Sequence, residues 1–335
     1  MRISKEEVQI LIDKWGVGDI TSYEKSTKGE SNHNWIVKTT HGKFILRRAP
    51  DFRKLKDLKF ELFYLTKLNE DKFPYKVPVP IKTNRGQDII KYKKGNWWLY
   101  RYIEGKIIEP ISIQLIPELA RMIALYHLFL KKNMLSNGKS ETEAFDKTTT
   151  IKDLKKLYAK TQRMVHKEAK HKIFLAECVK LMPLLESLKS DYYKKLPQYP
   201  LHRDLNPENI LWEGNKISGI IDFENVGTMN DNFITDIAIA IMFATTTEKE
   251  HKLDLNKTRK FLEVYQKYRR LSKQEIELIP DIIMAGFIGA FSWQYWLQLN
   301  DPERAQLHRL KLYSNAAQWH YLNRDKIIKA LNEIK

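Results

Sequence analysis

Three oxygen-bearing side chains between residues 201 and 223 have the types and spacing that phosphoryl transfer requires. Asp204 is followed five residues later by Asn209, and Asp222 comes after the turn-forming residues 213–215. The loose transition state of this reaction needs positioning and charge neutralisation more than covalent chemistry. A carboxylate can orient an acceptor hydroxyl, and a second carboxylate with an amide oxygen suits Mg2+. The pattern therefore predicts transfer of phosphate from Mg-ATP to an alcohol.

The elements that position these side chains follow from the flanking residues. Apolar residues at 210–212 and the stretch 216–221 enclose a turn, which predicts a β-hairpin. Asn209 precedes the first strand and Asp222 follows the second, so we expect both metal ligands at one end of the hairpin. Taken singly, residues of these types also populate turns for backbone reasons alone. His202 is expected to pack and hydrogen-bond the loop and to take no part in chemistry.

The composition is that of a large folded enzyme. The chain has 335 residues, of which 43% are hydrophobic, enough for two lobes or domains. Lysine and arginine (58) outnumber aspartate and glutamate (41), which gives a net charge of +17. Such a charge can indicate nucleic acid or an anionic membrane. The cations are scattered, however, and no nucleic-acid-binding motif accompanies them, so we expect neither partner.

Cysteine content and hydropathy indicate a cytoplasmic protein. The single cysteine, Cys178, excludes an internal disulfide and favours a reducing compartment. Residues 1–14 are charged and lack the apolar core of a signal peptide. The longest apolar stretch, 282–296, contains glycine and polar residues and is shorter than the ~20 residues that a bilayer requires. We expect it to be a buried core helix.

Strand patterns occupy the first part of the chain and helical patterns the rest. Alternating apolar residues predict strands at 19–27, 34–40, 43–48, 88–92 and 96–102. Apolar residues at intervals of three and four predict one helix at 52–68. The same periodicity then predicts helices at 112–131, 151–168, 172–190, 233–243, 256–270, 281–299 and 302–331. Residues 131–150 are polar enough to form a mobile linker.

This layout resembles the protein-kinase-like fold. The sequence is most similar to the aminoglycoside phosphotransferase and choline kinase superfamily, which includes homoserine kinases. The resemblance rests on three motifs, which are His202-Arg203-Asp204 with Asn209, Ile221-Asp222-Phe223-Glu224, and Asp236-Ile237-Ala238. It implies an α+β, bilobal fold with a five-stranded antiparallel sheet, one crossover helix and a mainly helical C-terminal lobe. Residues 1–103 would bind nucleotide, and residues 104–335 would carry the catalytic loop and the substrate site.

The resemblance also implies roles for the motif residues. Asp204 would be the catalytic base. Asn209 and Asp222 would bind magnesium, and Asp236 would brace the catalytic loop. The residues that would bind ATP lie in the N-terminal lobe.

Arg47 falls where many relatives have a lysine that contacts the nucleotide phosphates. A guanidinium is not equivalent to an ammonium, and the neighbouring Arg48 is a rival for this contact. Glu61, on the crossover helix, falls where the ion-pair partner of that cation sits. Two further sets of residues would contact the nucleotide through the backbone: a phosphate-covering turn at Gly29, Ser31 and Asn32, and a hinge at Tyr102 and Ile103.

The acceptor is open among several classes. The histidine-arginine-aspartate motif also occurs in Ser/Thr protein kinases, which are one alternative. Glu224 replaces the glycine of their Asp-Phe-Gly motif, however, and the short interval between Asp222 and Asp236 leaves no room for a long activation segment. A non-catalytic nucleotide-binding protein is another alternative, which the intact motif disfavours. We therefore favour a small hydroxyl substrate such as choline, an amino alcohol like homoserine, or an aminoglycoside.

Four residues are candidates for binding that substrate. Glu224 and Asp231 can bind a substrate ammonium, although both can equally be solvated loop acids. Trp293 and Trp296 share one helical face and can box a quaternary amine, although aromatic residues at this spacing are more often core. The sequence predicts neither the oligomeric state nor a preference between ATP and GTP.

Overall fold

The computed structural model describes residues 3–26, 33–133, 135, 147–188, 193–228 and 230–334. The predicted phosphate-covering turn with Gly29, Ser31 and Asn32 lies outside the described residues, as does most of the expected linker at 131–150.

The chain divides into two compact units. The first comprises Met1–Ile107 and Asn209–Thr228, and the second comprises Ile108–Glu208 and Met229–Lys335. The first boundary lies close to the predicted one at residue 103. The predicted second lobe, by contrast, included the hairpin segment, which belongs to the first unit because its strands bond to that unit's backbone. The N–H of Ile220 donates to the carbonyl oxygen of Lys76 at 2.9 Å, and Lys106 and Trp212 exchange bonds of 2.8 and 2.9 Å.

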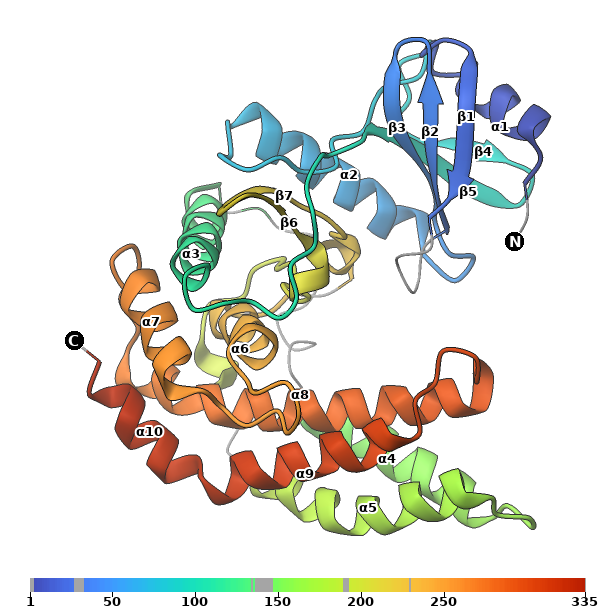
Figure 1. Cartoon of the computed structure of the whole chain (residues 1–335). Helices are drawn as coiled ribbons and strands as arrows, with labels where there is room; N and C mark the ends of the chain where they lie inside the picture. Colours follow the sequence, from blue (N-terminus) through green and yellow to red (C-terminus); the bar gives the residue numbers. More distant parts are fainter. Residues whose placement is uncertain are drawn as a thin grey trace. The chain divides into compact units, whose positions relative to one another are not determined.

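The first unit is built on the predicted five-stranded antiparallel sheet, whose strand order is β1-β2-β3-β5-β4 (Figure 1). Its elements are α1 (Lys5–Ile12), β1 (Ile20–Lys25), β2 (His33–Thr39), β3 (Gly42–Arg48), α2 (Leu55–Glu70), β4 (Ile90–Tyr92), β5 (Gly95–Arg101), β6 (Ile210–Glu213), β7 (Lys216–Ile220) and the 3-10 turn η4 (Glu224–Gly227). The alternation of strand residues puts Trp35, Leu46 and Trp97 on one buried face, against helix α1.

Helix α1 was not predicted, although its N-terminus carries a recognisable signal. The Ser4 hydroxyl accepts a hydrogen bond from the N–H of Glu7, and the Glu7 carboxylate accepts one from the N–H of Ser4. This capping box satisfies N–H groups that the first turn leaves without intrahelical partners. The buried residues Leu11 and Ile12 then anchor the helix in the core. A helix of only eight residues shows too little periodicity to stand out in the sequence.

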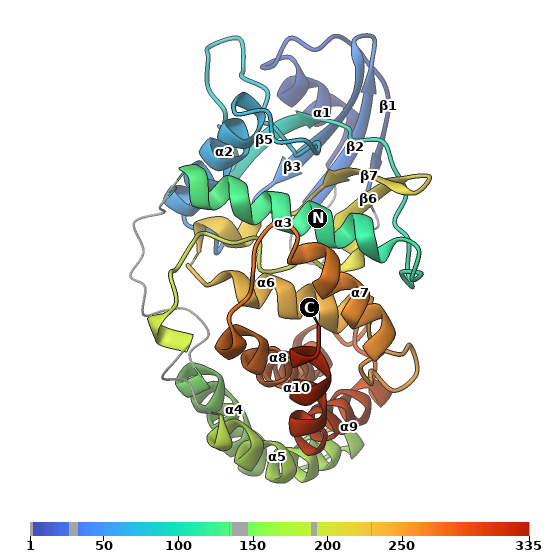
Figure 2. The same ribbon diagram turned by 90° about the vertical axis from the view of Figure 1, so that its left-hand side faces the viewer.

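The second unit is helical. Its helices are α3 (Ile116–Asn133), α4 (Lys147–Gln162), α5 (Ala169–Ser187), α6 (Phe233–Ala244), α7 (Leu255–Tyr265), α8 (Lys273–Asn300), α9 (His308–Leu322) and α10 (Arg324–Asn332), with the 3-10 turn η2 (Tyr193–Lys195). The 3-10 turn η3 (Pro207–Asn209) spans the boundary, since Asn209 belongs to the first unit. Helix α8 packs along α9 and against α6, while α5 packs on α4 and α9 (Figures 1 and 2). The single helix predicted at 302–331 is wrong, because the chain forms two helices that meet at Asn323.

Helix α8 is longer than predicted. It begins at Lys273 because Ser272 and Glu275 form a capping box, and Pro280 lies within it. With 28 residues it is long and apolar enough to cross a membrane by length and composition. The prediction that this apolar segment is too short to span a bilayer is therefore wrong. Nevertheless, 67% of its most apolar window is buried inside the structure, and core helices pass the same test.

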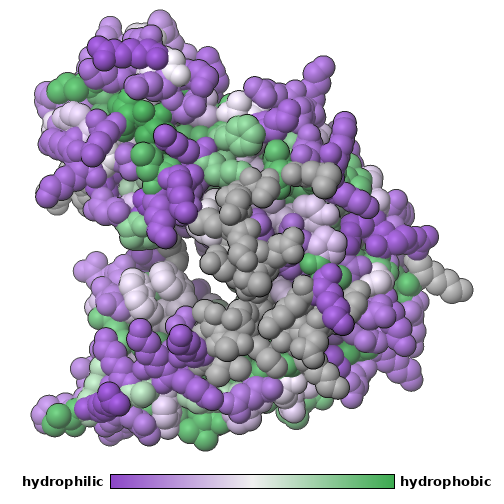
Figure 3. Space-filling view, turned by 180° about the vertical axis from the view of Figure 1, so that it is seen from behind, coloured by the Kyte–Doolittle hydropathy of each residue, from purple (hydrophilic) through white to green (hydrophobic). Residues whose placement is uncertain are grey.

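The surface shown in Figure 3 is rich in hydrophilic residues. Among the residues that Figure 3 colours by hydropathy, hydrophilic ones predominate, with hydrophobic patches between them. This distribution agrees with the 30% of charged residues in the chain.

Candidate active site

The hairpin places both predicted metal ligands at the same end of one two-stranded sheet. Strands β6 and β7 pair with Ile210 opposite Ile220, which confirms the predicted hairpin. Beyond this pair, the N–H of Ile221 donates to the carbonyl oxygen of Asn209 at 3.0 Å. Asn209 therefore lies just before the first strand and Asp222 just after the second. An amide oxygen and a carboxylate at one hairpin end are the hard oxygen ligands that suit a divalent cation such as Mg2+.

Arg47 on strand β3 faces the carboxylate of Asp222. Its Nη2 atom lies 2.7 Å from Oδ1 of Asp222 and 3.8 Å from the carboxylate of Glu224. Burial alone would lower the pKa of Arg47, but the carboxylates of Asp222 and Glu61 outweigh this effect and raise the pKa above its ordinary value. The guanidinium is therefore a permanent cation beside the carboxylate, and a metal ion bound by Asp222 would share that carboxylate with it.

The backbone at Asp222 adopts a conformation that side chains rarely take. Its φ angle is 64°, in the left-handed region. A non-glycine residue held there costs of order 1–3 kcal/mol, and such residues cluster at functional sites. The conformation turns the chain sharply at the end of β7 and thus directs the segment from Asp222 into turn η4.

Glu61 is paired with Arg53, and the expected ion pair between Glu61 and Arg47 is not formed. The Nη2 atom of Arg53 lies 2.7 Å from Oε2 of Glu61, and it also donates to the carbonyl oxygen of Glu224 at 2.7 Å. Burial raises the pKa of Glu61, while the charges of Arg53 and Arg47 oppose this shift. No motif in the sequence marks Arg53, which lies in an irregular segment before α2.

Strand geometry favours Arg47 over Arg48 as the candidate for contact with the nucleotide phosphates. Successive residues of a strand point to opposite faces, so only one of the two can face the hairpin end. Arg48 forms a short ion pair with Asp51, an exposed acid three residues away. Arg47 therefore stays the predicted phosphate-contacting residue.

The backbone N–H of Tyr102, one of the two predicted hinge residues, is already used within the sheet. The backbone N–H of Tyr102 donates to the carbonyl oxygen of Lys43 at 3.0 Å, as a continuation of the sheet. That donor is consequently committed within the protein, and Tyr102 cannot offer it to an adenine ring. The buried Ile103 follows directly, and its role in binding the base stays a prediction.

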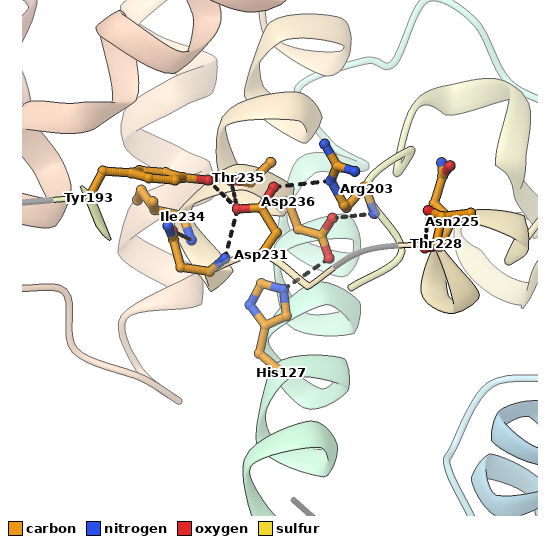
Figure 4. A network of polar contacts seen from close by, with 10 residues as sticks. His127, Tyr193, Arg203, Asn225, Thr228, Asp231, Ile234, Thr235 and Asp236 are labelled. Atoms are coloured by element: carbon orange, nitrogen blue, oxygen red, sulfur yellow. Dashed lines mark hydrogen bonds and ion pairs between the residues drawn. The ribbon is translucent and has the colours of Figure 1, made fainter. Parts of the chain in front are cut away.

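In the second unit, Asp236 holds the backbone of the loop that carries Asp204. Its Oδ1 atom accepts a hydrogen bond of 2.7 Å from the N–H of Arg203, and its Oδ2 atom lies 3.4 Å from Nε2 of His127 (Figure 4). Arg203 has a φ angle of 58°, so the loop turns through a left-handed residue immediately before Asp204. These contacts are the ones that a bracing role for Asp236 requires. His202, which was expected to support the loop, is fully buried.

Asn206 holds the carboxylate of Asp204 and was not recognised from the sequence. Its Nδ2 atom donates to Oδ1 of Asp204 at 2.7 Å, and its own Oδ1 atom accepts the N–H of Glu208 at 2.8 Å. Asp204 itself is half-buried. The Asn206 amide thus orients one oxygen of the Asp204 carboxylate. A general base held in place by a neighbouring group has this geometry.

Asp231 is a structural acid, which corrects the expectation that it binds a substrate ammonium. The carboxylate is fully buried and accepts hydrogen bonds from Tyr193, from Thr235 at 2.8 Å and from Nε of Arg203 at 3.0 Å (Figure 4). Burial raises the pKa of Asp231, and the charge of Arg203 opposes this shift. The same carboxylate therefore ties Arg203, beside the catalytic loop, to the beginning of α6.

Comparison with known proteins decides the family. The sequence profile described as "Phosphotransferase enzyme family" matches residues 23–271. The chain belongs to this family. It is similar to homoserine kinase of Bartonella tribocorum, with 28% identity over 277 residues, which cover 83% of this chain and 81% of the relative. It is also similar to homoserine kinase of Agrobacterium fabrum, with 25% identity over 307 residues, 90% of this chain and 88% of the relative.

Solved structures agree with this fold. An amicoumacin kinase in complex with AMP-PNP, Ca2+ and Ami superposes with a TM-score of 0.67 at 16% identity, covering 97% of this chain and 94% of the other. A microcompartment-associated aminopropanol kinase gives a TM-score of 0.64 at 15% identity, with 99% and 100% covered. The chain is thus an α+β phosphotransferase that transfers phosphate from ATP to a hydroxyl group of a small molecule, with a divalent metal ion.

The remaining predicted substrate residues of the phosphotransferase already have partners within the protein. The carboxylate of Glu224 already faces two guanidinium groups, Arg53 at 3.5 Å and Arg47 at 3.8 Å. A substrate ammonium would compete with both cations for it. The rings of Trp293 and Trp296 stack on each other with centroids 4.8 Å apart and an angle of 6°. Parallel rings at this distance leave no space for an ammonium between them, so a cation could contact only an outer ring face. A substrate role for these two residues stays a prediction.

Proposed function

We propose that this phosphotransferase phosphorylates the hydroxyl group of a small amino alcohol such as homoserine, with Mg2+ as its metal ion. The observation that carries the proposal is the hairpin end at which Asn209 and Asp222 flank the same pair of strands. The similarity to homoserine kinases over most of the chain supports the acceptor class. The stacked tryptophan pair offers choline no space between its rings. The similarity to an amicoumacin kinase, at 16% identity, concerns the fold alone.

The residues of the catalytic loop would act on the acceptor. Asp204 would accept a hydrogen bond from the acceptor hydroxyl and take its proton as the hydroxyl oxygen bonds to the γ-phosphorus of ATP. The bond from that phosphorus to the bridging oxygen breaks, and ADP leaves. Asn206 would hold the carboxylate in the orientation in which its second oxygen faces the hydroxyl. Asp236 and His127 would keep the backbone of Arg203 in place, which fixes the position of the next residue.

The residues of the first unit would act on the nucleotide. Asn209 and Asp222 would hold Mg2+, which neutralises charge on the phosphate groups when it is bound. Arg47 would add a second positive charge that never deprotonates, since its pKa is raised further by the nearby carboxylates. The strain at Asp222 is the kind of backbone cost that persists at functional sites.

A screen for ADP release tests this proposal. The full chain would be incubated with ATP and Mg2+ and with homoserine, ethanolamine, choline, a sugar or an aminoglycoside in separate reactions. The proposal predicts the highest kcat/KM with homoserine or a similar amino alcohol, and loss of that turnover in Asp204→Asn. Turnover confined to an aminoglycoside or to a peptide would contradict the acceptor class. A cytoplasmic location and the expectation of no nucleic-acid or membrane partner stay predictions from the sequence.

A further inference from the structure

Arg53 connects helix α2 to the segment that follows Asp222. One nitrogen, Nη2, contacts both the carboxylate of Glu61 and the carbonyl oxygen of Glu224, each at 2.7 Å. The Arg53 side chain is 6% exposed and that of Glu61 2% exposed, so solvent screens this pair little. Charge-assisted hydrogen bonds of a buried guanidinium fix the separation of the groups that accept them.

Two further contacts make α2 and this segment one packed body. A Cβ atom added at Gly227 would lie 2.2 Å from the carbonyl oxygen of Asp57, so the backbones meet at a distance that only glycine permits. The rings of Tyr64 and Phe223 also pack with centroids 6.2 Å apart. The backbone on the C-terminal side of Asp222 is consequently positioned by α2, and Arg53 is the charged part of that connection.

Arg47 and Arg53 lie close to three carboxylates. Arg47 lies 2.7 Å from Asp222, Arg53 lies 2.7 Å from Glu61, and both approach Glu224, at 3.8 and 3.5 Å. If Arg53 were absent, the buried carboxylate of Glu61 would have Arg47 as its nearest guanidinium among these residues. An unpaired buried carboxylate is costly, so it would draw Arg47 away from Asp222.

We propose that Arg53 is a positioning residue for the nucleotide site, because it neutralises Glu61 and so leaves Arg47 directed at Asp222. This role rests on the proposed function, in which Arg47 and Asp222 serve the nucleotide and its metal ion. Arg53, from the irregular segment before α2, forms with Glu61 the ion pair that was expected between Arg47 and Glu61.

A titration of the full chain with AMP-PNP, with and without Mg2+, tests the proposal without turnover. Arg53→Gln should weaken Mg-AMP-PNP binding at least about tenfold. The double variant Arg53→Gln with Glu61→Gln should recover most of the affinity, since no charged Glu61 remains to attract Arg47. Arg53→Lys, which keeps the charge but loses the planar fork, should lie between wild type and Arg53→Gln.

The matched control is Arg324→Gln, which removes an arginine that bonds Asp281 at 2.6 and 2.9 Å in the second unit. It should lower the melting temperature and leave nucleotide affinity unchanged. A double variant that binds as weakly as Arg53→Gln, or an Arg53→Gln that binds like wild type, would overturn the role of Arg53. If Arg53→Gln does not fold, the same titration of Arg53→Lys decides, and wild-type affinity there overturns it. Absence of Mg-dependent binding in the wild type would instead refute the proposed function.

Discussion

The guanidinium of Arg47 lies 2.7 Å from the carboxylate of Asp222, although 175 positions separate the two residues in the chain. The side chain of Arg47 is 4% exposed and that of Asp222 is 25% exposed. One residue of the central strand β3 therefore supplies positive charge at the end of the hairpin that carries the predicted metal ligands. A metal ion bound by Asp222 would share this carboxylate with a cation that the protein already provides.

Removal of the Asp222 carboxylate should weaken nucleotide binding itself. Asp222→Ala loses a predicted metal ligand, so the affinity for Mg-AMP-PNP should fall at least about tenfold, or about 1.4 kcal/mol. Isothermal titration calorimetry measures this directly. The control is Asp51→Ala, which removes an exposed acid paired with Arg48 in the same unit and should leave affinity unchanged. Equal affinity of Asp222→Ala and wild type would exclude Asp222 from the metal site.

Removal of the Asp204 carboxylate should instead act on turnover. Asp204→Asn should lower kcat by about 10²–10⁴-fold, the usual contribution of a general base, while nucleotide affinity stays close to wild type. Asn206→Ala, which frees a carboxylate oxygen of Asp204 from its 2.7 Å hydrogen bond, should cause a smaller loss of kcat. Steady-state kinetics with the best acceptor of the screen provide the measurement. Full activity of Asp204→Asn would remove Asp204 as the base.

The buried carboxylate of Asp231 should matter for stability and not for acceptor binding. Asp231→Asn leaves Arg203 without its ion-pair partner, so the free energy of unfolding should fall by about 3 kcal/mol. Denaturant unfolding measures this change. Asp301→Asn, whose pair with Arg304 is solvent-exposed, should cost about 1 kcal/mol or less. A large rise in KM for the acceptor with unchanged stability would restore a substrate role to Asp231.

Two glycine substitutions should have opposite effects. Gly227→Ala places a Cβ atom 2.2 Å from the carbonyl oxygen of Asp57, and the repulsion should lower the free energy of unfolding by about 1–3 kcal/mol. At Gly289, in helix α8, a Cβ atom meets nothing within 4 Å. Gly289→Ala should therefore raise the free energy of unfolding by about 0.5–1 kcal/mol, because alanine loses less entropy in a helix. A stability gain in Gly227→Ala would show that α2 and η4 are not in close contact.

A buried histidine should make stability depend on pH. Burial lowers the pKa of His320 to about 4, so the folded chain keeps this ring neutral at pH values where the unfolded chain protonates it. The unfolded state then binds more protons, and stability should fall as the pH drops from about 6.5 towards about 4, by up to ~1.4 kcal/mol per pH unit.

Denaturant unfolding of His320→Gln between pH 7 and 5 checks this expectation. The variant should lose stability less steeply than wild type as the pH falls, because glutamine does not titrate. His166→Gln, at an exposed position of the second unit, should keep the wild-type slope. Identical slopes for wild type and His320→Gln would indicate that His320 does not contribute to the acid sensitivity of the fold.

The sequence predicted the features that depend on neighbouring residues. Strand alternation identified the sheet, and the turn between 210–212 and 216–221 identified the hairpin, because both patterns span only a few residues. Helix α1 and the division between α9 and α10 were missed. The apolar pattern of α1 is too short to recognise, and that of α9 continues into α10 without a break. Packing against the rest of the unit decides where such helices begin and end.

Residue types and spacing by themselves predicted phosphoryl transfer, since Asp204, Asn209 and Asp222 have the types and intervals that this reaction requires. Tertiary structure alone decided which charges meet. Arg53 and Glu61 come from an irregular segment and a helix, and Arg47 and Asp222 are 175 positions apart. No local pattern encodes such pairs, because a buried charge takes whichever partner the packed backbone brings within reach. Asp231 is a further example. In the sequence it looks like an exposed loop acid, but the packed backbone buries it and brings Tyr193 and Arg203 within hydrogen-bonding distance.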